Sequence, residues 1–154
     1  MGLHEGGLVE MIRIFISYTT RDFYLDRDKL AEIDHLASSY GFVFIDALHN
    51  DSVNRQRRVE QELIEASVVL FIRTSGCSRS EWVGWERHKA VEYGKYCIEV
   101  PFDETGPWEL NLKKIEATLK GMIANKCTRT GILLRSIPAR DGHIGIKMRY
   151  YDVK

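Results

Sequence analysis

The sequence alternates between short apolar runs and longer segments whose apolar residues recur at helical spacing. Four runs of strand length are rich in β-branched and aromatic residues: 12–17, 42–46, 67–72 and 96–102. Four other segments carry apolar residues at intervals of three and four: 26–40, 54–67, 80–94 and 108–123. Strands that alternate with helices predict right-handed crossovers and a parallel sheet covered on both faces. The expected fold class is therefore α/β and flavodoxin-like, with the first strand inside the sheet.

Several residues make local predictions within this pattern. Gly41 follows the first helical segment and is expected to cap its C-terminus. Ser80 precedes the third helical segment and is expected to cap its N-terminus. In the second helical segment, the apolar face predicts burial of Val59, Leu63 and Ile64.

The length of 154 residues suits one compact domain, expected over 12–154 after a tail at 1–11. Its last part departs from the alternation. Two strand-like runs, 130–137 and 143–151, flank a segment with turn chemistry at 138–142. We expect a C-terminal hairpin extension there, and one of its runs is a candidate fifth strand.

Composition indicates a cytoplasmic protein with no membrane or nucleic-acid partner. No run of 18 apolar residues occurs, and the three cysteines, Cys77, Cys97 and Cys127, are too few and too widely spaced for a disulfide framework. The net charge is zero, although 111–154 holds more Lys and Arg than Asp and Glu. That basic end lacks interleaved aromatic platforms and any nucleic-acid module, which favours a solvated surface.

Ligands of open α/β sheets bind beyond the carboxyl ends of the strands, where the strand order reverses. For the expected order, this point lies between the first and third strands, near the loops 17–22 and 73–80 and the segment 49–51. The glycine-rich phosphate motifs, the zinc-binding H-E-x-x-H and the nucleophile motif G-x-S-x-G are all absent from the sequence. The third strand also ends without the acceptor aspartate of a phosphorelay receiver. These absences argue against dinucleotide-fold, P-loop, zinc and serine-hydrolase chemistry.

Two segments remain as candidates for the chemistry of this edge: FISYTTRD at 15–22 and SRSEWVGWERHKA at 78–90. Trp82 and Glu86 are four residues apart, so they share one helix face that begins beside the third-strand loop. The alternative for Glu86 is a solvated acid paired with Lys89, and the alternative for Trp82 is packing against the sheet. For Asp22 the alternative is a role in loop structure.

These two segments resemble the motifs of TIR and TIR-like domains. FISYTTRD resembles their first-strand box, and S-E-W-V-G-W-E at 80–86 resembles their Ser-x-Trp-x-x-x-Glu segment; the likeness covers 12–102. FVFIDALHND at 42–51 looks most similar to the TIR-like proteins of bacterial Thoeris antiphage systems, which make cyclic ADP-ribose isomers. The Arg-Asp-x-x-Pro-Gly loop and the late Phe-Trp box of adaptor TIR domains are missing. The resemblance therefore favours an enzyme over an adaptor.

The resemblance implies that Glu86 is the catalytic residue for cleaving NAD at the nicotinamide–ribose bond. NAD is then a substrate, and neither a cofactor nor a metal is expected. It further implies ADP-ribose or a cyclic ADP-ribose signal in prokaryotic antiviral defence, self-association, and an effector protein that responds to the product. The expected substrate-binding residues are Phe15, Ser17, Tyr18, Arg21, Asp46, His49, Asn50, Ser75 and Trp82.

Two other functions remain open. One is a TIR-like interaction module that docks a partner without turnover. The other is an enzyme like the nucleoside 2-deoxyribosyltransferases, which also set a helix glutamate against an anomeric carbon. Glu86 supports this second alternative as well as NAD cleavage. For His49 and Asn50, the alternative role is to form the loop after the second strand.

Overall fold

The structure is a computed structural model that describes residues 12–128. Its four strands are all parallel and lie in the order β2-β1-β3-β4. Their bounds are β1 (Ile12–Ser17), β2 (Gly41–Phe44), β3 (Val68–Arg73) and β4 (Tyr96–Pro101). The predicted α/β fold and the internal position of β1 are therefore confirmed. The expected tail at 1–11 and the C-terminal hairpin with its candidate fifth strand lie outside the described residues.

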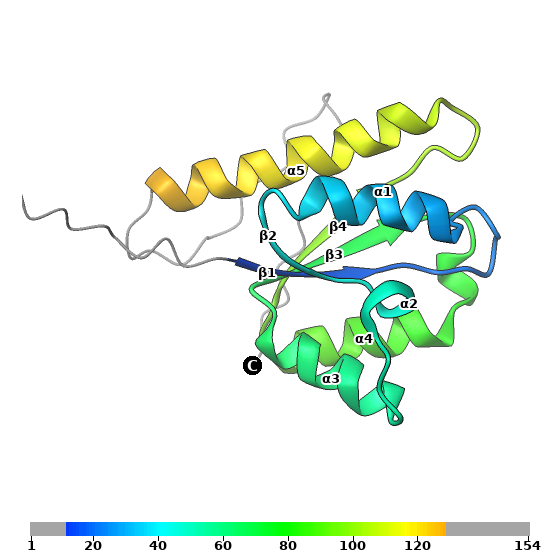
Figure 1. The fold of residues 1–154 in the computed structure, drawn as a ribbon, viewed down its shortest axis with the longest axis vertical. Coiled ribbons are helices and arrows are strands. Elements are labelled where there is room, and N and C mark those ends of the chain that lie inside the picture. Colours follow the sequence, from blue (N-terminus) through cyan, green and yellow to red (C-terminus); the bar gives the residue numbers. More distant parts are fainter. Residues whose placement is uncertain (1–11, 129–154) are drawn as a thin grey trace, which may run out of the picture.

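Helices cover both faces of the sheet (Figure 1). On one face α1 (Arg27–Ala37) lies beside α5 (Trp108–Thr128), and on the other α3 (Arg55–Glu65) lies beside α4 (Glu81–Glu92). Side chains alternate along β1, so Ile14 and Ile16 join the core under α1 and α5 while Phe15 joins the core under α3 and α4. The same alternation directs the side chain of Ser17 toward the α3/α4 face.

Three local predictions can be compared with the structure. Ser80 caps α4 as expected, because its Oγ accepts a hydrogen bond from the backbone N–H of Val83 at 3.2 Å. The helix end predicted at Gly41 is wrong, since α1 ends at Ala37 with Ser38 as its C-cap. Gly41 instead begins β2, where a Cβ atom would lie 2.2 Å from the carbonyl oxygen of Ile12. Close contact between strands, and not helix capping, therefore requires glycine at this position.

Two further predictions needed correction. Val59 and Leu63 are buried, but Ile64 is 49% exposed because it lies about 100° around α3 from Leu63 and points away from the sheet. The second strand was expected to run to residue 46, yet it ends at Phe44. The next residues form a one-turn helix, α2 (Asp46–His49), where the sequence pattern predicts strand and loop.

The loops at the carboxyl edge are fastened together by Asp22. Its carboxylate accepts hydrogen bonds from the backbone N–H groups of Gly76, at 2.7 Å, and of Tyr24, at 3.2 Å. Burial by itself would raise the pKa of Asp22, but these bonds and one from Thr74 hold it below its ordinary value. Asp22 therefore joins the loop after β1 to the loop after β3. This is the role in loop structure that was the alternative for this residue.

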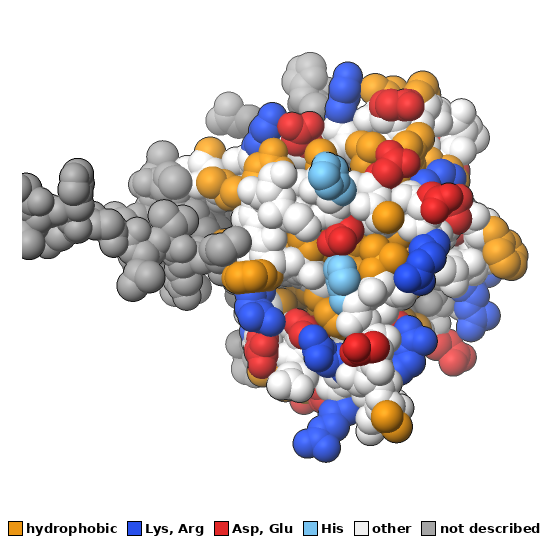
Figure 2. Space-filling view, in the orientation of Figure 1, with side chains coloured by type: hydrophobic (Ala, Val, Ile, Leu, Met, Phe, Trp, Pro, Cys, Tyr) orange, Lys and Arg blue, Asp and Glu red, His pale blue; other side chains and the backbone are white. Residues whose placement is uncertain are grey.

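Charges of both signs are interspersed over the face seen in Figure 2. No helix among the described residues combines the length and apolar character needed to cross a membrane.

Candidate active site

A pocket of about 220 Å³ opens at the carboxyl edge of the sheet, between the loop after β1, the short helix α2 and the start of α4. Because these elements follow β1, β2 and β3, the pocket lies where the strand order reverses, as the fold predicts. It is lined by Tyr18, Thr19, Thr20, Arg21, Asp46, Ser80, Trp82 and Glu86.

Glu86 lies on the inner face of α4 and is only 3% exposed. The hydroxyl of Ser17, the last residue of β1, donates a hydrogen bond to its carboxylate, and the side chain of Trp82 makes a second one. The interpretation of Glu86 as a solvated acid paired with Lys89 is therefore wrong. Lys89 lies instead 3.1 Å from Glu92 and 3.5 Å from Glu60.

The electrostatic environment of Glu86 disfavours its charged form. Burial raises the pKa of Glu86 to about 8; the hydrogen bonds from Ser17 and Trp82 oppose this, while the charge of Asp46 adds to it. Within residues 12–124, no Lys or Arg forms an ion pair with this carboxylate. At neutral pH Glu86 is therefore mainly the neutral acid, and a cation placed beside it would favour ionisation.

Asp46 places a second carboxylate on the opposite wall of the pocket. It begins α2, and its two oxygens are held by the Asn50 amide at 2.6 Å and the Arg55 guanidinium at 3.1 Å. The hydroxyl of Tyr18 fixes the same helix, since it accepts a hydrogen bond from the backbone N–H of Ala47 at 3.0 Å. Burial is the main reason that the pKa of Tyr18 rises to about 12, so its phenol stays neutral.

Trp82 lines the pocket and stacks on the indole of Trp85, which packs against the core under α3 and α4. Trp82 and Trp85 have ring centroids 5.1 Å apart and planes inclined by 23°. Trp82 is 37% exposed, so part of its ring is accessible to a ligand. Trp85 is not among the predicted site residues and does not line the pocket, although the Trp-x-x-Trp spacing puts both rings on neighbouring positions of one helix face.

Of the ten predicted site residues, five line the pocket: Tyr18, Arg21, Asp46, Trp82 and Glu86. Two more bond directly to these, Ser17 to Glu86 and Asn50 to Asp46. The other three, Phe15, His49 and Ser75, lie elsewhere. Ser75 lines a separate pocket beside β3 and α4, and its N–H and hydroxyl both bond to Glu104. Thr19, Thr20 and Ser80 also line the pocket and were not predicted, since hydroxyl residues in loops carry no distinctive sequence signal.

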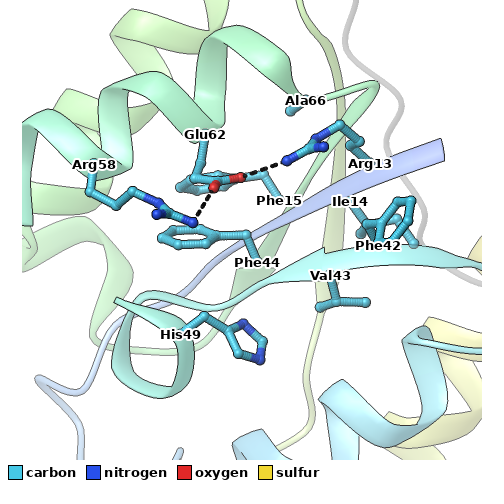
Figure 3. A pocket seen from close by; sticks show the side chains of 10 residues that line it. All are labelled: Arg13, Ile14, Phe15, Phe42, Val43, Phe44, His49, Arg58, Glu62 and Ala66. Carbon is cyan, nitrogen blue, oxygen red and sulfur yellow. Dashed lines mark hydrogen bonds and ion pairs between the residues drawn. The ribbon is translucent and has the colours of Figure 1, made fainter. Parts of the chain in front are cut away.

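Phe15 and His49 line a different pocket, of about 170 Å³, between β2 and α3 (Figure 3). Phe15 is buried and packs against Phe44, with ring centroids 5.4 Å apart. The Nδ1 atom of His49 accepts a hydrogen bond from the backbone N–H of Ile45 at 2.9 Å, and its Nε2 lies 3.3 Å from Asp34. Both residues have structural partners here, and neither faces Glu86.

The arginines of this second pocket are paired. Arg58 lies 2.7 Å and Arg13 3.5 Å from the carboxylate of Glu62. Figure 3 shows this carboxylate between the two guanidinium groups, beside the rings of Phe15 and Phe44. The pocket that contains Glu86 is called the active-site pocket for its candidate role, and the pocket that contains Glu62 is called the β2 pocket.

The described residues contain no cluster of three His, Cys, Asp or Glu side chains placed to hold a metal ion. A scan of the chain against protein-family models finds no matching family, and a search of curated proteins finds no significant match. The likeness to TIR-like domains is thus a prediction that rests on the motifs themselves.

Proposed function

We propose that this protein cleaves NAD at the bond between nicotinamide and ribose, with Glu86 as the catalytic residue. The observation that carries the proposal is a buried carboxylate that has no cationic partner among the described residues and faces a pocket at the sheet's reversal point. Strongly shifted carboxylates in clefts are typical of functional sites, because burying an uncompensated acid costs the fold stability.

The chemistry of the bond suits this arrangement. When the C1′–N bond breaks, its electron pair passes to the nicotinamide ring, which leaves as a neutral molecule, and positive charge develops on the ribose. A fixed carboxylate stabilises that charge more than it stabilises the ground state. Glu86 in its ionised form supplies this charge, and the exposed face of Trp82 offers a surface on which the cationic ring can lie.

Substrate charge explains how the acid becomes ionised. A pyridinium cation beside Glu86 lowers the pKa of its carboxyl group from about 8. The proton of Glu86 then leaves to solvent as the substrate binds. Ser17 remains as a hydrogen-bond donor that holds the carboxylate in position.

The fate of the ribose cation decides the product. Water adds its oxygen to C1′ and gives up one proton to yield ADP-ribose, whereas an internal nucleophile of the same substrate yields a cyclic ADP-ribose. The resemblance to Thoeris TIR-like proteins supports the cyclic product, a role in antiviral defence, an effector that binds the product, and assembly of several copies.

The decisive experiment incubates the full chain with NAD and separates nicotinamide, ADP-ribose and cyclic ADP-ribose by chromatography. Specific activity is measured across a dilution series, and we expect it to rise with protein concentration. Constant specific activity contradicts assembly, and ADP-ribose as sole product contradicts cyclisation. No nicotinamide release at any concentration contradicts the enzymatic proposal and favours an interaction module.

A nucleoside 2-deoxyribosyltransferase-like activity is a second candidate because of the pocket's size. Its volume of about 220 Å³ is below the roughly 300–1,000 Å³ of pockets that enclose a drug-sized ligand, so it suits one nucleoside. Asp46 would supply the second carboxylate. Exchange of a labelled base into a 2′-deoxynucleoside tests this candidate, which fails if the base is not exchanged while NAD is consumed.

A further inference from the structure

Phe23 has a strained backbone conformation and an exposed side chain. Its φ angle is +60°, in the left-handed region, where Cβ crowds the following carbonyl oxygen and a bulky residue is strained. Its side chain is 89% exposed, so the fold gains almost nothing from the ring. Glycine would satisfy this turn at lower cost, which points to a role for the ring outside the protein's own packing.

The turn that presents Phe23 is held in place. The backbone N–H of Phe23 bonds to the carbonyl oxygen of Thr20 at 3.1 Å, and the carboxylate of the preceding Asp22 bonds to Gly76 on the loop after β3. Phe23 therefore stands on an anchored loop. It is two residues beyond Arg21, which lines the active-site pocket.

The size of the pocket requires most of a dinucleotide to lie outside it. At about 220 Å³, the pocket is smaller than those that enclose drug-sized ligands, so the nicotinamide riboside end fills it and the remainder crosses the rim.

Charge determines the direction in which the rest of the dinucleotide extends from the pocket. Arg55, the first residue of α3, does not line the pocket and is paired with Asp46 at 3.1 Å. Arg21 is the basic residue among those that line the pocket; it is exposed and makes no ion pair within residues 12–124. A diphosphate is therefore attracted toward Arg21, which brings the base attached to it to the loop that carries Phe23, two residues further along the chain.

We infer that Phe23 stacks on the adenine ring of the substrate and so selects a dinucleotide over a mononucleotide, an inference that rests on the proposed NAD cleavage. An aromatic ring accepts a base face without a specific hydrogen bond, and such stacking strengthens binding roughly 5- to 150-fold per base. Phe23 is a specificity-determining residue in this scheme. It takes no part in breaking the bond.

The test compares NAD with nicotinamide mononucleotide, which has the same scissile bond but no adenosine. Phe23→Gly is expected to raise the KM for NAD at least about fivefold, the lower end of the stacking range, with kcat unchanged. The KM for the mononucleotide should not change, and Phe23→Trp should restore the KM for NAD. Because glycine relieves the backbone strain, the melting temperature of Phe23→Gly should equal or exceed that of the wild type.

A direct binding measurement separates this inference from the proposed activity. ADP-ribose is titrated into wild type and Phe23→Gly by calorimetry, and sedimentation measures the oligomeric state of both. Weaker ADP-ribose binding by the variant supports the inference even if NAD is not cleaved. Equal KM and equal binding overturn it while leaving the proposed function intact. A variant that changes only self-association also overturns it, because Phe23 would then contact another copy.

Discussion

The active-site pocket and the β2 pocket hold carboxylates in opposite charge environments. In the β2 pocket, two guanidinium groups lie within 3.5 Å of Glu62. In the active-site pocket, Glu86 receives neutral hydrogen-bond donors, and the charge that acts on its pKa is the acid Asp46. The fold has neutralised the first carboxylate internally. The second carboxylate has no cationic partner among the described residues.

The largest expected difference between the pockets is in turnover. We expect Glu86→Gln to keep the fold and to lower NAD cleavage at least about a hundredfold, the scale for loss of one electrostatic group in the transition state. Glu62→Gln is the matched control in the β2 pocket and should leave the rate within about twofold. Initial rates of nicotinamide release at pH 8 measure both. Equal rates for wild type and Glu86→Gln would falsify the catalytic assignment.

The second expected difference is in pH dependence. Because cleavage needs ionised Glu86 and burial raises its pKa to about 8, kcat/KM should rise about tenfold per pH unit and level off near pH 8. Asp46→Asn should move this midpoint to lower pH, since the charge of Asp46 contributes to the shift. The profile is measured from pH 5.5 to pH 9.5. A midpoint near the ordinary glutamate pKa would show that Glu86 is not in the environment described above.

Stability should change in opposite directions in the two pockets. The folded-state pKa of Glu86 is raised above the ordinary 4.5, so its contribution to stability is present below pH 4.5 and is lost as pH rises through about 8. Glu86→Gln should therefore stabilise the fold by roughly 2–4 kcal/mol at pH 8.5 and have little effect at pH 4.5. Glu62→Gln should destabilise by about 1 kcal/mol at pH 7, since it removes a partner of two arginines.

Urea unfolding curves at the three pH values measure these free energies. The comparison fails if Glu86→Gln is less stable than wild type at pH 8.5, because the buried carboxylate would then have a compensating partner.

The smallest expected effect comes from Ser17. Its hydroxyl bonds to the Glu86 carboxylate and lowers the pKa of that group, so Ser17→Ala should move the midpoint of kcat/KM to higher pH. At pH 7 the rate should fall about three- to tenfold and should recover in part at pH 9.5. Ser67→Ala is the control, because the Ser67 hydroxyl accepts a bond from the Arg13 N–H beside the β2 pocket. If both variants have the same profile, the Ser17 hydroxyl does not act on Glu86.

Much of the fold could be predicted because its signals are local. The alternation of strand-like and helical apolar patterns predicted all four described strands and the main helices. Ser80 predicted the start of α4, because its hydroxyl accepts a hydrogen bond from the backbone N–H three residues further on. The short helix α2 escaped prediction, since a single turn has no hydrophobic period and depends on bonds from distant residues such as Tyr18 and Arg27. Gly41 was misinterpreted because its close neighbour, Ile12, is far away in the sequence.

The candidate site likewise has one part that the sequence predicts and another that only the tertiary structure decides. The sequence by itself placed Trp82 and Glu86 on one helix face, because their spacing of four residues fixes that relation in any α-helix. Only the tertiary structure set Ser17 against Glu86 across 69 residues, turned Ser75 and His49 to other partners, and held Phe23 at positive φ. The physical reason is that periodicity is a property of neighbouring residues. Burial and charge environment, which raise the pKa of Glu86, depend on every segment that packing brings near it.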